Sequence, residues 1–219
     1  MLRDFQSLLS TVYEIDHRLD IYDFLVTDPA LLSQWEEPGS LRATEEKLLI
    51  QEHENELAML LFLDSELLNR LFNQDPRDHL GPGNLADFCT VLEGISHFNY
   101  LAWNASTDKS VTLMELEMQA EVDKYVSARA ILHQQRTNSD LSESLYRRLF
   151  ENPDFDANLP PVEQLRYRDA SAYAGQYCRS LEKRFPPERF GAEMIEDLRT
   201  FYRLPQPDKV SHIRTVSFI

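Results

Sequence analysis

The chain has little glycine and no long apolar run. Its 219 residues include only 6 glycines, which argues against a glycine-rich phosphate-binding loop and against a turn-rich all-β fold. The longest apolar run, Leu57 to Leu63, is far shorter than the roughly 20 residues that a membrane-spanning helix needs. Met1 to Asp4 show no sign of the apolar segment of a signal peptide. We therefore expect neither a membrane-spanning protein nor one exported by a cleavable signal.

Cysteine and basic residues are scarce as well. The only two cysteines, Cys89 and Cys178, lack the spacing of a zinc site or a redox motif, and we expect both to be reduced in a cytoplasmic protein. The formal net charge of the chain is −15. Because nucleic acid phosphates and anionic lipids repel such a chain, we expect no nucleic acid partner and no membrane partner.

The short motifs of common enzyme classes are also missing. The sequence contains no Gly-x-Ser-x-Gly elbow, no Walker loop, no dinucleotide fingerprint and no His-Glu-x-x-His. The candidate pairs have the spacings His53-x-x-Glu56 and Glu93-x-x-x-His97, which are not the Glu-x-x-His spacing of di-iron helical bundles. The sequence therefore predicts no metal and no cofactor, and it favours a non-enzymatic interaction or regulatory protein, of undetermined oligomeric state.

What the chain does contain is enough apolar side chain for a sizeable core. Hydrophobic residues make up 42% of it, including 12 Phe and 9 Tyr. The fold class that we expect is mainly α: a helical bundle of about five to seven helices with a small antiparallel β element near the N-terminus. We expect one domain over residues 1–219, with an N-terminal α/β part (1–80) and a helical part (81–219). The longest segments with apolar residues at helical spacing are 84–103, 112–135 and 162–185.

Residues 47–64 can be interpreted as a hairpin or as a helix. In the hairpin, Leu48–Gln51 and Leu57–Leu63 are strands around a polar tip at residues 53–56, and Asp64 caps the helix that follows. In the helix, His53 and Glu56 would lie on a seam that faces the core. We favour the hairpin. A short strand within residues 21–26 and a last strand within 210–219 complete the expected β structure.

Three polar residues are the candidate catalytic site. Glu93 and His97 are four residues apart, so they share one face of the predicted helix. Glu121 interrupts the apolar stripe of the next helix, where an unpaired carboxylate would be costly to bury. Carboxylates and imidazoles that project inward from several helices form the metal centres of some bundles. The alternative function is therefore a metal- or acid–base-dependent enzyme that uses these residues, although an ordinary i,i+4 pair and a hydrogen-bonded Glu121 explain the same pattern.

Gly94 lies between Glu93 and His97 in the interior of a predicted helix. Glycine there costs about 1 kcal/mol of stability relative to alanine. Such a glycine indicates a close approach of a neighbouring element more often than it indicates a ligand site.

The last quarter of the chain is basic, whereas the rest is acidic. Residues 166–219 hold ten Lys and Arg against seven Asp and Glu, which leaves 12 basic and 30 acidic residues in 1–165. On the predicted helix over 162–185, Arg168, Arg179 and Lys183 line one face, with Ala172 and Gly175 between them. This basic strip is the predicted contact surface for an acidic protein or an anionic ligand, or for the acidic part of the chain itself.

Overall fold

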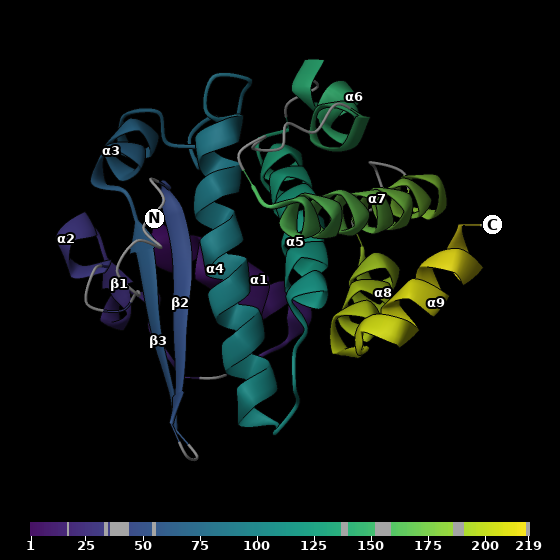
Figure 1. Ribbon diagram of the computed structural model, residues 1–219. Helices are drawn as coiled ribbons and strands as arrows, with labels where there is room; N and C mark the ends of the chain where they lie inside the picture. Colours follow the sequence, from purple (N-terminus) through teal and green to yellow (C-terminus); the bar gives the residue numbers. More distant parts are fainter. Residues whose placement is uncertain are drawn as a thin grey trace.

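The structure of the protein is a computed structural model that confirms a mainly helical fold with a small β-sheet near the N-terminus (Figure 1). The residues that it describes contain nine α-helices, compared with the five to seven expected. These residues are 1–16, 18–32, 35, 44–53, 56–136, 140–151, 159–185 and 191–217.

The sheet is a hairpin with one added strand. β2 (Glu46–His53) and β3 (Glu56–Leu63) pair antiparallel along their whole length, which confirms the hairpin over residues 47–64. Its tip, residues 54 and 55, lies outside the described residues. The strand expected within residues 21–26 is confirmed as β1 (Leu25–Val26), which pairs in parallel with β3. The sheet is therefore mixed, with the order β1-β3-β2.

The segments that flank the hairpin are short helices. A 3-10 turn, η1 (Ile21–Asp23), leads into β1, and α2 (Pro29–Leu32) follows it. The hairpin ends where α3 (Ser65–Asn73) begins, because the Asp64 side chain accepts hydrogen bonds from the backbone of Glu66 and Leu67. The predicted cap at Asp64 is thus present.

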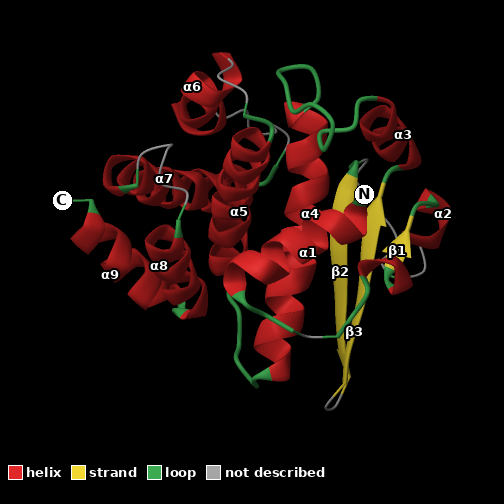
Figure 2. Cartoon of the chain, turned by 180° about the vertical axis from the view of Figure 1, so that it is seen from behind, coloured by secondary structure: helices red, strands yellow, loops and turns green. Residues whose placement is uncertain are grey.

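Two long helices form the centre of the molecule. α4 (Leu85–Ser106) and α5 (Leu113–Gln134) lie side by side and are joined by a short turn. The hairpin covers one side of α4 and α5 covers the other (Figure 1), while α1 (Leu2–Tyr13) crosses both helices on the face that is turned toward the viewer in Figure 2. Because neighbours enclose α5, its polar residues are buried along with its apolar ones. This enclosure places charged side chains inside the protein.

The C-terminal helices pack against the free side of α5. α6 (Asp140–Tyr146) continues into a π-helical turn, η2 (Arg147–Glu151), and α7 (Pro161–Arg184) crosses α5. α8 (Ala192–Arg203) and α9 (Gln206–Val216) complete the chain. The strand predicted within residues 210–219 is therefore wrong. Buried residues at helical spacing, Lys209, Ile213 and Val216, turn one face of α9 inward.

Most of the core is a single apolar cluster. It includes buried residues from α1, from the sheet and from each of the long helices, and it reaches Val216 in α9. None of the described helices is long and apolar enough to cross a bilayer.

Candidate functional site

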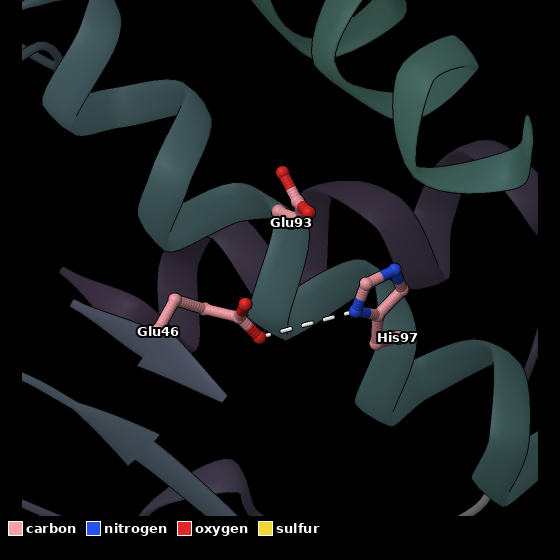
Figure 3. Close-up of side chains that lie close together, drawn as sticks. All are labelled: Glu46, Glu93 and His97. Atoms are coloured by element: carbon pink, nitrogen blue, oxygen red, sulfur yellow. Dashed lines mark ion pairs between the residues drawn. The ribbon is translucent and has the colours of Figure 1, made fainter. Parts of the chain in front are cut away.

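Three side chains from two elements converge between the sheet and α4. Glu46 is the first residue of β2, and Glu93 and His97 lie one turn apart on α4. One potential ligand atom from each residue lies within 4.8 Å of the other two (Figure 3). The shortest recorded approach joins Nδ1 of His97 to Oε1 of Glu46, at 3.9 Å. The structure thus brings two of the predicted site residues together and adds Glu46.

Gly94 makes room for the Glu46 side chain. A Cβ atom at position 94 would lie 2.9 Å from Oε1 of Glu46 and 2.8 Å from a methyl carbon of Leu61. Both distances are shorter than real Cβ atoms show. The close approach that the sequence indicated at Gly94 is therefore the approach of the hairpin to α4, and it delivers a carboxylate between Glu93 and His97.

A second carboxylate lies on the other side of the imidazole. Nε2 of His97 is 3.6 Å from Oε2 of Glu117 on α5, and Arg166 of α7 approaches the same carboxylate at 3.9 Å. The side chains of His97 and Glu117 are each 8% exposed. His97 therefore lies between two carboxylates, Glu46 and Glu117, in the interior of the protein.

Lys124 connects Glu121 to this group. Its ammonium lies 2.6 Å from a carboxylate oxygen of Glu93 and 2.7 Å from one of Glu121. Glu121, which the sequence placed in an apolar stripe, is partly buried, with 22% of its side chain exposed. We refer to the whole set as the carboxylate cluster. Its members are Glu46, Glu93, His97, Glu117, Glu121, Lys124 and Arg166.

Burial and neighbouring charges compete in setting the pKa values of the cluster. Burial alone would lower the pKa of His97, but Glu117 and Glu46 raise it to about 10. Burial raises the pKa of Glu46, and His97 opposes this shift. Burial acts in the same direction on Glu93, but Lys124 and His97 hold its pKa below the ordinary value. The imidazole is thus protonated at neutral pH, and burial disfavours the negative charge of Glu46, in contrast to that of Glu93.

Three buried polar atoms of the cluster lack a hydrogen bond within the described part of the chain. They are Oε1 of Glu46, Nε2 of His97 and Nε of Arg166. Leaving such an atom unpaired costs about 1–3 kcal/mol, and native structures contain few of them. Three such atoms in one cluster indicate that its side chains are arranged for a ligand and not for hydrogen bonds among themselves.

A cleft of about 640 Å³ opens onto the cluster from the side of α7 and η2. Its charged lining comprises Glu46, Glu93, Glu121, Lys124 and Arg148, and Cys89 also faces it. Burial raises the pKa of the Cys89 thiol to about 12, so that this cysteine is not a nucleophile at neutral pH. The apolar part of the lining is formed by Pro82, Leu85, Ala86, Leu149 and Leu159.

The basic strip on α7 is less continuous than the sequence suggested. Arg168, Arg179 and Lys183 are exposed as expected. Gly175, however, is covered by the protein itself, since a Cβ atom there would lie 3.2 Å from Phe150. Arg179 lies 3.2 Å from Glu182 on its own helix. The strip therefore keeps its charges and the exposed Ala172 but loses Gly175 from the surface between them, and its role as a contact surface stays a prediction.

Comparisons with protein-family models, with curated proteins and with solved structures find no match for this chain. The cluster must therefore be interpreted from its own geometry. Three of its members were predicted from the sequence, and four were not: Glu46, Glu117, Lys124 and Arg166. The position of Lys124, three residues after Glu121, was a visible signal. Nothing local marked Glu46, because its contact with α4 depends on the long-range packing of the hairpin.

Proposed function

We propose that this protein is a metal-dependent enzyme whose divalent ion is held by Glu46, Glu93 and His97. The observation that supports this proposal most directly is the convergence of three ligand atoms within 4.8 Å, two of which belong to residues that line a cleft, Glu46 and Glu93. Two ligand atoms that each lie about 2.1 Å from one ion are about 3.0–3.4 Å apart. The 3.9 Å between Glu46 and His97 can reach this range by small side-chain rotations.

The surroundings of His97 have the arrangement of a metal-bound histidine. If Nδ1 faces the ion together with Glu46, Nε2 points to Glu117. Histidines that bind metals usually donate their second ring N–H to a carboxylate, which fixes the ring and increases its basicity. Arg166 in turn approaches Glu117. Nε2 of His97 lacks a hydrogen bond within the described residues. With Nδ1 bound to the ion, Nε2–H would be the donor to Glu117.

The charges of the carboxylate cluster also fit a divalent ion. Four carboxylates (Glu46, Glu93, Glu117 and Glu121) face two permanent cations, Lys124 and Arg166. With His97 protonated, the formal sum is −1. Replacing that proton by a divalent ion brings the sum to zero. Lys124 also occupies one oxygen of Glu93, so the other oxygen can face the ion.

Two carboxylates and one imidazole favour an ion that accepts both oxygen and nitrogen ligands, such as Zn²⁺, Mn²⁺ or Fe²⁺. Three protein ligands leave coordination positions for water and substrate, and a bound ion lowers the pKa of such a water. The reaction class that we propose is metal-assisted hydrolysis of a small molecule in the cleft. Glu121 lines the cleft and is held by Lys124, so it is the proposed acceptor for the proton of the water.

The first test is metal binding by the purified protein. We expect Zn²⁺ or Mn²⁺ to bind with one-to-one stoichiometry in isothermal titration calorimetry, and we expect Glu46→Gln and His97→Ala to weaken binding at least tenfold. Two exposed residues outside the cluster, Glu193 and His79, supply matched controls as Glu193→Gln and His79→Ala. Wild-type protein without measurable affinity for these ions would refute the proposal.

The pH dependence of metal binding provides a second check. Metal binding must displace the proton of His97, because its pKa is raised to about 10 in the metal-free protein. The apparent affinity should therefore rise with pH up to about pH 10, and calorimetry in buffers of different ionisation enthalpy should show the release of about one proton. His97→Ala should abolish that release.

A second candidate function, a cytoplasmic interaction protein, is supported by a different observation. Arg168 and Lys183 are exposed, and neither has a recorded ion pair within the described part of the chain. An acidic partner would find these charges available. The experiment that tests this candidate is the double charge reversal Arg168→Glu and Lys183→Glu, which should abolish binding to an acidic polymer such as polyglutamate.

A further inference from the structure

The π-helical turn η2 forms the boundary between the cleft and a second hollow. Arg148 lines both of them, and its neighbour Leu149 lines the cleft. The second hollow, of about 500 Å³, is basic on one side. It is lined by Ser144, Tyr146, Arg147, Arg148, Glu151, Arg179 and Glu182.

Two guanidinium groups of this turn are available to a ligand. Arg147 and Arg148 are both exposed, and neither has a recorded ion pair within the described residues. Nε of Arg148 donates to Oγ of Ser144 at 3.0 Å, which leaves the other N–H groups of its guanidinium free to point outward. The third arginine, Arg179, already lies 3.2 Å from Glu182. The adjacent pair on η2 is therefore the free part of the basic surface.

The Phe150 side chain anchors the turn that carries these arginines. Phe150 packs directly onto Gly175 of α7, where a Cβ atom would lie 3.2 Å from the ring. The same ring contacts Tyr146, with the centroids 5.3 Å apart, and Tyr125 at 6.2 Å. Short π-helical turns within helices occur frequently at functional sites. The absence of a side chain at Gly175 thus lets η2 pack closely against α7. Arg148 lines both the cleft and the second hollow, and we refer to its position as the rim of the cleft.

We propose that Arg148, assisted by Arg147, binds an oxyanion group of the molecule that occupies the cleft. This inference rests on the proposed function, since two of the proposed metal ligands, Glu46 and Glu93, line the same cleft as Arg148. Arginine is suited to this task because its planar N–H groups match the oxygens of phosphate and carboxylate. The apolar part of the cleft lining is suited to an apolar part of the same molecule. The predicted ligand is therefore a small molecule with an apolar part and a phosphate or carboxylate group.

The carboxylates that line the cleft explain why the anionic group belongs at Arg148. Glu46, Glu93 and Glu121 line the cleft and would repel a second anion placed among them. A divalent ion at the proposed site would reduce this repulsion. We therefore expect oxyanion binding at Arg148 to strengthen when the metal site is loaded.

The test is calorimetric titration with two probes, inorganic phosphate and acetate, on metal-loaded and on EDTA-treated protein. We expect at least one probe to bind the loaded protein, and we expect Arg148→Met to weaken that binding about tenfold or more. Arg214→Met, which removes an exposed arginine of α9, should leave the binding unchanged. Binding of phosphate alone assigns a phosphoryl group to the ligand, and binding of acetate assigns a carboxylate. Circular dichroism checks that each variant is folded.

A second variant tests the anchor. Gly175→Ala should displace Phe150 and weaken oxyanion binding while metal affinity stays unchanged. The inference is overturned if neither probe binds, or if Arg148→Met binds both probes as tightly as wild type does. If either result is found and metal still binds normally, the oxyanion site is refuted and the proposed metal site is not. If no metal binds but Arg148-dependent oxyanion binding persists, the proposed function fails and the rim site remains.

Discussion

Two polar clusters share the helices α4 and α5, and they differ in how well their hydrogen bonds are satisfied. Ser96 and Asp123 belong to one cluster, and the next residue in each helix, His97 and Lys124, belongs to the other. The first cluster is sealed inside the protein. We refer to it as the Asp123 network, and it consists of Tyr13, Ser96, Gln119, Asp123 and Lys209.

Hydrogen bonds account for the polar groups of the Asp123 network. The Asp123 carboxylate accepts from the Tyr13 and Ser96 hydroxyls and from the Gln119 amide. The ammonium of Lys209 donates to Gln119 at 2.7 Å and to the backbone carbonyl of Phe201 at 2.9 Å. Burial raises the pKa of Asp123 to about 6 and lowers that of Lys209 to about 7. This network ties α1, α4, α5 and α9 together, so its role is structural.

The carboxylate cluster shows the opposite properties. Its contacts to His97 are ion pairs of 3.6 and 3.9 Å, three of its buried atoms lack hydrogen bonds within the described residues, and a cleft reaches it. The comparison suggests a general criterion. Buried charge that is fully hydrogen-bonded and sealed holds the fold together, whereas buried charge that is partly unpaired beside a cleft is the better candidate for chemistry.

The largest effect that we predict is the loss of stability on removing the centre of the Asp123 network. Asp123→Ala leaves the Tyr13 and Ser96 hydroxyls without their acceptor, removes one of the two acceptors of the Gln119 amide, and leaves Lys209 without the nearby negative charge. We expect the free energy of unfolding to fall by about 3–5 kcal/mol, measured by urea denaturation.

The carboxylate cluster supplies the contrasting variant. Glu46→Gln removes a charge that burial destabilises, so its free energy of unfolding should lie within about 1 kcal/mol of wild type or above it. If Asp123→Ala is as stable as wild type, or if Glu46→Gln is the more damaging substitution, the distinction between the two clusters is wrong.

A smaller effect is expected at Gly94, and it separates function from stability. Gly94→Ala gains up to about 1 kcal/mol of helix propensity, but its Cβ displaces the Glu46 carboxylate and contacts Leu61. Stability should therefore change by less than about 1 kcal/mol, while metal affinity falls about tenfold because one ligand has moved. Calorimetry and urea denaturation on the same sample measure both quantities.

The control for this prediction is Gly175→Ala, which introduces the same methyl group against Phe150 and should leave metal affinity intact. Equal metal affinity in wild type and Gly94→Ala would show that Glu46 does not need its present position, and it would remove that residue from the proposed site.

Local signals in the sequence were enough to predict most of the fold. The cap at Asp64 and the apolar periodicity of α4 and α5 both depend on residues that are close in the chain. α9 was missed because only one face of it is buried and the polar residue Lys209 lies on that face. A buried lysine interrupts the apolar pattern on which such predictions rely.

The site was only partly predictable for a related reason. Glu93 and His97 share a helix, so their spacing placed them together. Glu46 and Arg166 reach the site from β2 and α7, and no spacing rule connects them to α4. The sequence held no signal that Glu117 and Asp123 are buried, because an amphipathic helix is expected to have a solvent-exposed face, and α5 has almost none. Gly94 was the one residue whose signal pointed across the interface between β2 and α4.

The smallest effect that we predict concerns the basic strip, which belongs to neither cluster. The variant is the double charge reversal Arg168→Glu and Lys183→Glu, since Arg179 has a partner in Glu182. Both residues are exposed, so the free energy of unfolding should stay within about 0.5 kcal/mol of wild type, as for most surface substitutions. Metal binding should not change either. If the strip binds an acidic partner, the wild-type protein should bind polyglutamate immobilised on a sensor, and the double variant should not.

The salt dependence tests whether the binding is electrostatic, and a second charge reversal tests whether it is specific to the strip. Attraction between exposed charges is screened over about 8 Å at physiological ionic strength, so binding through the strip should weaken steadily as salt is added, mainly through a slower association rate. Reversing another exposed basic residue, Arg214→Glu on α9, should have no effect if the strip is specific. Loss of stability in the double variant would instead show that the strip docks onto the acidic part of the chain. Unchanged binding in the double variant would show that the strip is only a solvated helix face.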